Sequence, residues 1–117
     1  MQSQLEIIST QPNYYVVVAC KDEKVIGTAM GIVCPDIVGE CQPYMLVENV
    51  VVSSTYQGKG IGKILMATLE DFSNKMHCSY IILASGGNRE QAHRFYESVG
   101  YKSTKTGFIK RMESARL

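Results

Sequence analysis

The chain has 117 residues, enough for one domain, and its 45% hydrophobic and 20% charged content is ordinary for a soluble globular protein. A formal net charge of +1 provides no broad basic field for nucleic acid. The N-terminus lacks the basic and apolar regions of a signal peptide, and the longest apolar run, residues 14–20, is too short to span a bilayer. We therefore expect a single cytoplasmic domain, residues 1–117, that binds neither nucleic acid nor membrane.

The cysteines give no sign of a metal site. They form no Cys-x-x-Cys pair and have no ligand-like spacing to either histidine. We expect reduced thiols and no bound metal. The residues concerned are Cys20, Cys34, Cys41 and Cys78.

Two apolar segments near the start of the chain predict a β-hairpin. Residues 14–20 are β-branched and aromatic, which is typical of a strand buried on both faces. A polar connection leads to a second apolar segment, residues 25–33. Gly27 and Gly31 within that segment indicate a bulge or the close approach of another group.

A central strand is predicted for residues 44–53 and an amphipathic helix for residues 60–76. Three glycines between them leave backbone N–H groups uncovered where the helix begins, an arrangement that favours phosphate. A stripe of apolar residues is expected to face the sheet. The stripe consists of Ile61, Ile64, Leu65, Leu69, Phe72 and Met76.

The last third of the chain predicts a further strand, a helix and two short strands. The strand is expected at residues 80–84. In the helix, Asn88 and Gln91 are spaced as a capping box, and Gly100 ends it. Residues 101–112 hold the two short strands. The order β-β-β-α-β-α-β-β predicts a mixed α/β sheet, with antiparallel hairpins at its ends and a parallel central pair joined by the first helix.

The spacing of the glycine-rich loop excludes the two commonest phosphate motifs. A Walker loop would need Gly where Gln57 stands and Ser or Thr where Ile64 stands. A dinucleotide fingerprint, G-x-G-x-x-G, fails from both Gly58 and Gly60. What remains is Gln-x-x-Gly-x-Gly, ending at Gly62, after an apolar strand. A glycine-rich turn that only lets the helix and strand pack closely is the alternative.

This pattern resembles the Q/R-x-x-G-x-G/A motif of the GNAT superfamily of N-acetyltransferases. A second segment, Asn88-x-x-x-Ala92-x-x-Phe95-Tyr96-x-x-x-Gly100-Tyr101, is similar to the family's N-x-x-x-A-x-x-F-Y-x-x-x-G-F. The resemblance covers about residues 14–112. It implies a GNAT-like acyl-CoA N-acyltransferase fold and an acetyl-CoA-dependent enzyme without a metal. The acceptor would be a primary amine of an amino sugar, polyamine, amino acid or protein, which attacks the thioester directly.

The resemblance also implies where acetyl-CoA binds. In the family the central strand and the next parallel strand separate at a β-bulge, and the pantetheine arm pairs with the backbone of the central strand. The pyrophosphate lies on the amides of the loop. Asn88 would lie near the pantetheine, cap its helix, or do both. The expected cofactor-binding residues are Val50, Val51, Val52, Gln57, Gly58, Lys59, Gly60, Ile61, Gly62, Lys63 and Asn88.

Two residues are candidates for acid–base catalysis. Glu48 is the candidate base, acting directly or through a water molecule. In a regular strand it would share a face with Val50, although a bulge would change that. A structural ion pair or hydrogen bond is the alternative role for its carboxylate. Tyr96 matches the family's tyrosine beside the thioester sulfur and is the candidate acid; its alternative role is that of a core aromatic.

The acceptor side departs from the family. Family members usually have an opening strand and two helices before the hairpin, whereas thirteen residues precede it here. A bulky acceptor on an open face, a second subunit that completes the pocket, or a truncated and weakly active enzyme would each fit. An open edge at residues 14–20 predicts a homodimer or an exchanged N-terminal segment.

Three other readings bear on function. Residues 47–52 resemble those of glucosamine-phosphate acetyltransferases, although those more often have Asp where Asn49 stands. A non-catalytic acyl-CoA-binding module or sensor is the main alternative to an enzyme. Thioesterase-like handling of CoA by an unrelated α/β fold is a third.

Overall fold

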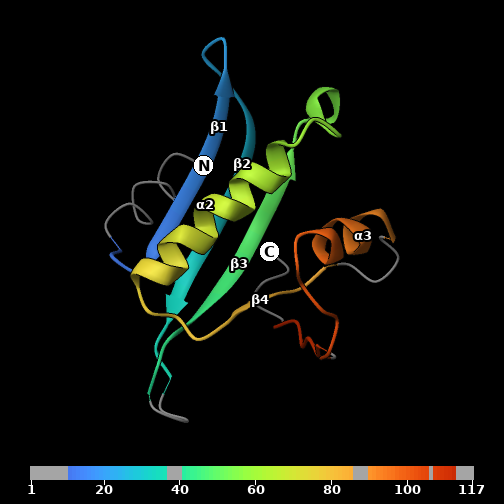
Figure 1. Ribbon diagram of the computed structural model, residues 1–117. Coiled ribbons are helices and arrows are strands. Elements are labelled where there is room, and N and C mark those ends of the chain that lie inside the picture. Colours follow the sequence, from blue (N-terminus) through green and yellow to red (C-terminus); the bar gives the residue numbers. More distant parts are fainter. Residues whose placement is uncertain (1–10, 37–40, 86–89, 106, 113–117) are drawn as a thin grey trace. The chain divides into compact units, whose positions relative to one another are not determined.

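The computed structural model describes residues 11–36, 41–85, 90–105 and 107–112. The chain divides into two compact units, Met1–Leu83 and Ala84–Leu117, and each is described by itself. The single domain expected from the chain length stays a prediction. In chain order the elements are β1 (Tyr14–Lys21), β2 (Lys24–Cys34), β3 (Tyr44–Val52), the 3-10 helix η1 (Ser54–Tyr56), α2 (Ile61–Lys75), β4 (Ile81–Leu83) and α3 (Glu90–Ser98) (Figure 1).

The first unit is a mixed sheet with one helix on it. The strand order is β1-β2-β3-β4, with β1–β2 and β2–β3 antiparallel and β3–β4 parallel. Parallel neighbours need a crossover connection, and α2 provides it by running across one face of the sheet (Figure 1). The predicted mixed α/β sheet with a parallel central pair is confirmed for these four strands.

The β1–β2 connection is a tight two-residue turn. Lys21 pairs with Lys24, and the two residues between them, Asp22 and Glu23, have φ angles of 51° and 67°. Positive φ at both central positions is the requirement of a type I′ turn, whose twist matches that of the strands. The hairpin end of β1 is thus held close to the start of β2.

Only one face of the sheet is covered by α2. A Cβ on Gly27 would lie 3.2 Å from side-chain atoms of both Ile61 and Leu65, so the predicted close approach at this glycine is α2 itself. Val16 and Val18 lie on the other face and are exposed, so the prediction that residues 14–20 are buried on both faces is wrong. The core between sheet and helix consists of Ile26, Ala29, Val33, Met45, Val47, Leu65, Met66 and Leu69.

The predicted apolar stripe of α2 needs correction at Ile64 and at Met76, which follows the helix and is 39% exposed. Ile64 is 65% exposed, whereas Met66 is 1% exposed. The buried positions Leu65, Leu69 and Ser73 recur with the helical period, and Ile64 lies on the opposite side of the helix from them. Phe72 does face the sheet, where its ring stacks on Tyr15 with centroids 4.2 Å apart.

Gly31→Ala is expected to lower the free energy of unfolding by about 1–3 kcal/mol, the usual cost of overpacking a core. A Cβ there would lie 2.9 Å from the sulfur of Met45 and 3.1 Å from a methyl of Leu69, both fully buried. Urea denaturation measures the change, with Gly107→Ala as the control because a Cβ at Gly107 would have no neighbour within 4 Å. Equal stability of Gly31→Ala and wild type would show that Met45 moves aside without cost.

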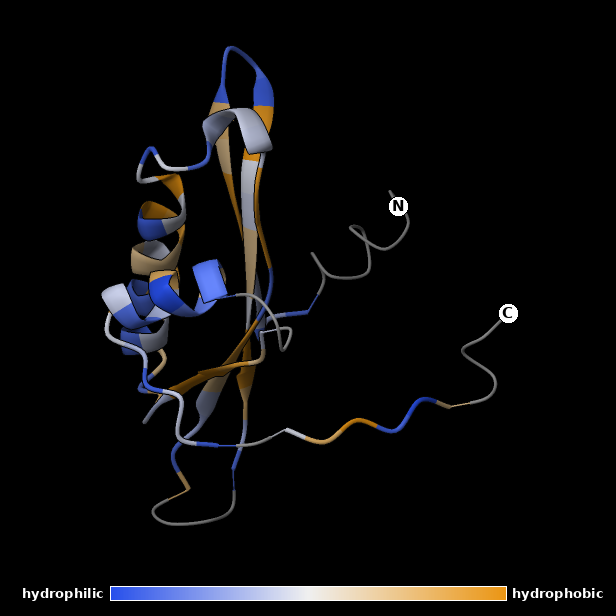
Figure 2. Ribbon diagram, turned by 90° about the vertical axis from the view of Figure 1, so that its right-hand side faces the viewer, coloured by the Kyte–Doolittle hydropathy of each residue, from blue (hydrophilic) through white to orange (hydrophobic). Residues whose placement is uncertain are grey.

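The prediction of two short strands at residues 101–112 is wrong for the described part of that segment. Residues 101–105 and 107–112 contain no strand. Phe108, Ile109 and Met112 are 96%, 77% and 60% exposed, and Figure 2 shows this apolar stretch as an extended ribbon. Apolar, β-prone residues form a strand only beside a pairing partner, and the sequence pattern does not provide one.

No helix in the described ranges combines the length and the apolar character needed to cross a membrane.

Candidate functional site

The glycine-rich loop is fixed to the ends of β2 and β3. The Ser53 N–H donates to the Ile26 carbonyl at 2.8 Å, and the Tyr56 N–H donates to the Ser53 carbonyl at 2.8 Å. The side-chain amide of Gln57 donates to the Val52 carbonyl at 3.0 Å. Gln57 therefore holds the loop against the last residue of β3, a structural role that its place in the sequence motif did not reveal.

The glycines of this loop expose its backbone. Gly58 and Gly60 have φ angles of 77° and 83°, which favour glycine, and a Cβ on either would meet no atom within 4 Å. Glycines needed for close packing would have near neighbours, as Gly27 and Gly31 do, so this geometry argues against the close-packing interpretation. Gly60 also caps α2 without a side-chain hydrogen bond, so the first N–H groups of the helix keep their capacity to bind an anion.

A β-bulge interrupts β3 just before its end. Glu48 pairs with Met30 and Val51 pairs with Thr28, so β3 has one residue more than β2 between these pairs. Asn49, within the bulge, has a φ angle of 58°. Bulges re-aim side chains and end regular pairing.

The parallel pairing of β3 with β4 stops at the same place. Its last pair is Val47 with Leu83, where β4 ends. Among the described residues, Val51 and Val52 pair with β2 on one side and Val50 lies in the bulge, and none of the three pairs with a strand on the other side. This unpaired backbone can accept an extended ligand in the manner of an added strand.

The bulge also changes the position of Glu48. Because of the extra residue, Glu48 shares a sheet face with Val51 and not with Val50, the change that a bulge was expected to bring. Glu48 is exposed, so water can solvate its carboxylate. An exposed carboxylate on the face away from α2 is able to accept a proton.

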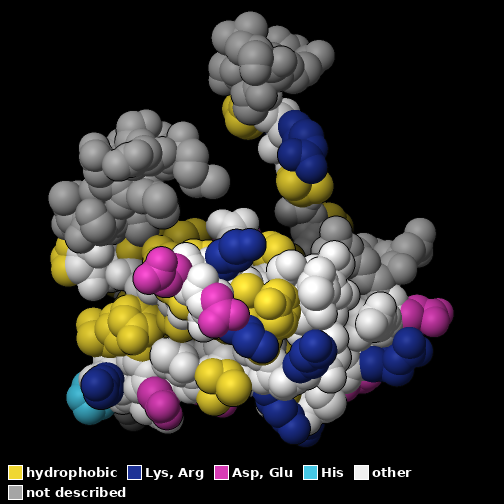
Figure 3. All heavy atoms as spheres, turned by 90° about the horizontal axis from the view of Figure 1, so that it is seen from above, with side chains coloured by type: hydrophobic (Ala, Val, Ile, Leu, Met, Phe, Trp, Pro, Cys, Tyr) yellow, Lys and Arg dark blue, Asp and Glu magenta, His cyan; other side chains and the backbone are white. Residues whose placement is uncertain are grey.

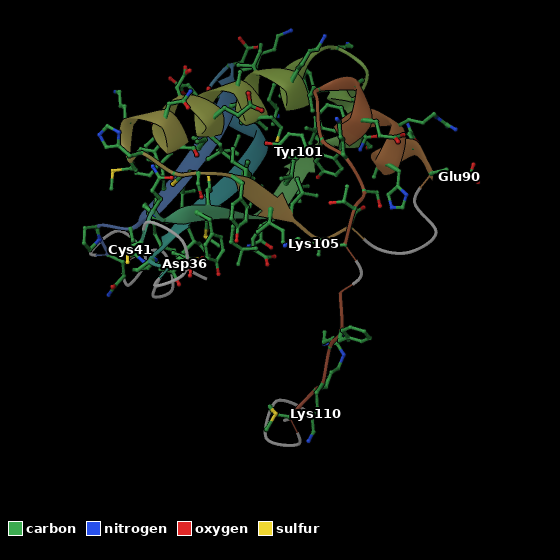
Figure 4. All side chains as sticks on the ribbon, turned by 60° about the horizontal axis from the view of Figure 1, so that its bottom comes forward. Asp36, Cys41, Glu90, Tyr101, Lys105 and Lys110 are labelled. Atoms are coloured by element: carbon green, nitrogen blue, oxygen red, sulfur yellow. The ribbon has the colours of Figure 1, made fainter. Side chains whose placement is uncertain are left out.

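In the second unit, Tyr96 lies at the end of α3. The Gly100 N–H donates to the Glu97 carbonyl at 3.1 Å and the Tyr101 N–H donates to the Tyr96 carbonyl at 3.0 Å, with φ of 99° at Gly100. This is a Schellman motif, and it confirms the predicted helix end. The ring of Tyr101, labelled in Figure 4, lies edge-on to the ring of Tyr96 with centroids 6.2 Å apart. Tyr96 thus has a packing role in addition to the predicted chemical one.

Residues 1–101 match the model of the Acetyltransferase (GNAT) family. The chain belongs to this family. The resemblance found in the loop and helix motifs is therefore confirmed, as is the GNAT-like fold class.

Known GNAT proteins similar to the chain support the same assignment. It is 29% identical over 91 residues to the probable glucosamine 6-phosphate N-acetyltransferase of Drosophila melanogaster, covering 76% of this chain and 40% of that protein. The structure of a GNAT family acetyltransferase from Staphylococcus aureus has 30% identity and a TM-score of 0.78, with 95% and 74% of the two chains covered. The structure of AAC(6')-Iy with the bisubstrate analogue CoA-S-monomethyl-acetylneamine has a TM-score of 0.83 at 18% identity, with 96% and 78% covered, and shows a common fold.

Part of the predicted GNAT site is contiguous. The hydrogen bond from Gln57 to Val52 joins the loop, residues 57–63, to the unpaired backbone of β3, and Glu48 lies on the same strand. Tyr96 belongs to the other unit, so its joint action with Glu48 stays a prediction. Asn88 lies outside the described residues, and both of its proposed roles stay predictions.

Sequence reasoning missed one feature beside the GNAT loop. The ammonium groups of Lys21 and Lys59 each lie over the ring of Tyr56, 5.5 Å from its centroid. Figure 3 views the molecule from the end where β1 and β2 are joined and shows Lys and Arg side chains interspersed with Asp and Glu. The sequence carries little sign of these contacts because Lys21 is distant in sequence from the loop.

At the other end of β3, two tyrosines form a stacked pair. Tyr44 stacks on Tyr80 with centroids 5.1 Å apart, and the neighbouring Cys34 thiol raises the pKa of the Tyr44 phenol above its ordinary value. A raised pKa keeps the phenol neutral and moves it away from the range that suits general acid–base catalysis at neutral pH. In the described ranges the four cysteines form no disulfide, and no group of three or more His, Cys, Asp or Glu could hold a metal ion.

Proposed function

We propose that this chain transfers the acetyl group of acetyl-CoA to a primary amine. The observation that carries the proposal is the continuity of two bare backbone surfaces. The unpaired end of β3, beyond its bulge, leads through a hydrogen-bonded loop into the exposed glycines at the start of α2. In acetyl-CoA the pantetheine arm is joined to the pyrophosphate, so the two parts of the ligand follow the same order as these two surfaces.

The described residues support the proposed binding of acetyl-CoA. The amides of Gly58 to Lys63 would bind the pyrophosphate, since open space adjoins both Gly58 and Gly60 and the N-terminus of α2 favours negative charge. The backbone of Val50 to Val52 would bind the pantetheine amides as an added strand does. Both contacts use backbone atoms, so recognition of acetyl-CoA depends on the glycines and the bulge and only weakly on side-chain size.

The reaction needs one proton removed and one supplied. As the amine nitrogen bonds to the thioester carbonyl carbon, the carbon–sulfur bond breaks and coenzyme A leaves as a thiolate. Glu48, exposed on β3, would accept the proton of the amine directly or through water. Tyr96 would give a proton to the thiolate. Each such transfer typically contributes about 10²–10⁴ in rate.

The acceptor is proposed as a primary amine, with amino sugars to be tested first because the Drosophila melanogaster relative is named a probable glucosamine 6-phosphate N-acetyltransferase. The test measures thiol release from acetyl-CoA with amino sugars, polyamines, amino acids and lysine peptides. Amine-dependent release with formation of the acetylated product supports the proposal. Tight binding of acetyl-CoA by calorimetry, without release for any amine, would instead make the chain a non-catalytic acyl-CoA-binding module.

A homodimer through β1 is proposed as well. β1 is the first strand of the sheet order, and the side chains of Val16 and Val18 are exposed. Apolar strands at a sheet edge invite pairing with another chain.

Sedimentation is expected to show a dimer at micromolar concentration that Val18→Lys converts to a monomer, because the charge would be buried in the interface. Val25→Lys is the matched control: Val25 is also exposed but is the second residue of β2, next to the turn. A wild-type monomer without concentration dependence would contradict the dimer.

A further inference from the structure

The feature that extends the proposed function is the group of Lys21, Tyr56 and Lys59, here called the lysine–tyrosine cluster. Lys21 ends β1, Tyr56 ends η1, and Lys59 lies within the glycine-rich loop. Both ammonium groups lie 5.5 Å from the centroid of the Tyr56 ring. Two cations from separate parts of the chain are thus gathered around one aromatic ring.

Each exposed cation–π contact with Tyr56 is weakly stabilising, and the two ammonium charges repel each other. An anion that contacts both lysines would remove the repulsion and add an attraction to each. The cluster therefore has more to gain from a bound anion than from its own contacts.

The position of the cluster indicates which anion. Tyr56 directly precedes Gln57 and Lys21 ends β1, so two members of the cluster lie outside the glycines, whereas Lys59 stands between Gly58 and Gly60. The pyrophosphate is matched to the backbone amides of those glycines. Coenzyme A carries one further phosphate, on the 3′ oxygen of its adenosine, next to the pyrophosphate. Lysine ammonium groups are suitable point-charge donors for a phosphate monoester of this kind.

We propose that Lys21 and Lys59 bind the 3′-phosphate of acetyl-CoA and make the protein select the 3′-phosphorylated cosubstrate over its dephospho form. The proposal rests on the proposed use of acetyl-CoA. The ring of Tyr56 holds the two ammonium groups in place, and its half-buried position leaves part of the ring open to the adenine.

The hairpin turn that carries Lys21 also carries carboxylates, and its overall charge decides which control variant the test needs. Asp22 and Glu23 are exposed beside Lys21, and Lys24 follows them, so the turn as a whole has no net charge. A general positive field is therefore not what selects the phosphate. Lys24→Met removes the same charge from the same turn, at the residue that pairs with Lys21, and is the matched control.

Calorimetry with acetyl-CoA and with acetyl-3′-dephospho-CoA separates the possible results. For wild type we expect about tenfold tighter binding of acetyl-CoA, as expected for two exposed charge pairs. Lys21→Met should reduce this ratio to about threefold while leaving the affinity for the dephospho compound unchanged, and Lys59→Met should reduce the ratio similarly. Lys24→Met should keep the ratio of wild type.

Equal affinity of wild type for the two compounds would overturn the inference and leave the proposed function intact. A ratio that falls as far in Lys24→Met as in Lys21→Met would also overturn it, because a general field would then be responsible. If wild type binds neither compound, the proposed use of acetyl-CoA fails first. Because Lys21 and Lys59 belong to separate segments, a folding defect in one variant still leaves the other as a test.

Discussion

Gly60→Asp is expected to weaken the binding of acetyl-CoA by about 10–100-fold, the equivalent of losing one hydrogen bond to a charged group. Gly60 caps α2 with a φ angle of 83°, and a Cβ there would enter open space. An aspartate side chain would occupy the place proposed for the pyrophosphate and repel it. Calorimetric titration with acetyl-CoA measures the loss.

Two companion variants separate this effect from unfolding. Gly100→Asp has a similar positive φ and open surroundings at the end of α3, so it should carry a similar backbone cost of about 1–2 kcal/mol without weakening binding. Gly62→Asp places an acid in the first turn of α2, which has none, and replaces a helical glycine. It should raise the thermal stability slightly and still weaken binding. Unchanged affinity in both loop variants would refute the pyrophosphate site.

The sequence predicted the elements whose signals are local. The hydrophobic period marked β1, β2, β3 and α2 to within one or two residues, and Gly100 marked the end of α3. The conformation of Gly58 and Gly60 was also predictable, because only a glycine-rich loop presents its backbone in this way. These parts of the site depend on neighbouring residues alone.

The rest depends on pairing between distant segments. The bulge at Asn49 depends on how β3 pairs with β2, and it moved Glu48 onto the face of Val51. The cluster around Tyr56 depends on the turn that carries Lys21. The apolar period at residues 107–112 indicated a strand, but a strand also needs a partner, which the period does not supply.

Tyr96→Phe is expected to lower turnover by roughly 10–10³-fold with little change in acetyl-CoA affinity. The structure explains why the variant should fold. Tyr96 contacts Phe95 and Tyr101 through its ring, and phenylalanine keeps that ring and the hydrogen bond from Tyr101 to the backbone. Only the hydroxyl is lost, so the thermal unfolding midpoint should barely change.

The size of the expected loss follows from proton affinities. An ordinary phenol, with a pKa of about 10, is protonated at neutral pH and can give its proton to a thiolate whose conjugate acid has a pKa of about 8.5. The transfer is slightly uphill, which limits the gain to the lower part of the range for acid catalysis. An interaction made mainly in the transition state changes kcat more than KM.

Steady-state kinetics of Tyr96→Phe from pH 6 to 9 provide the test, with Tyr101→Phe as the matched control. Tyr101 is the ring partner of Tyr96 and follows the same helix, so its variant has the same chemical change in the same packing cluster. If only Tyr96→Phe loses turnover, the hydroxyl of Tyr96 supplies the proton. If both variants turn over at the wild-type rate across this range, Tyr96 serves packing alone, and solvent or the protonated attacking nitrogen supplies the proton to the thiolate.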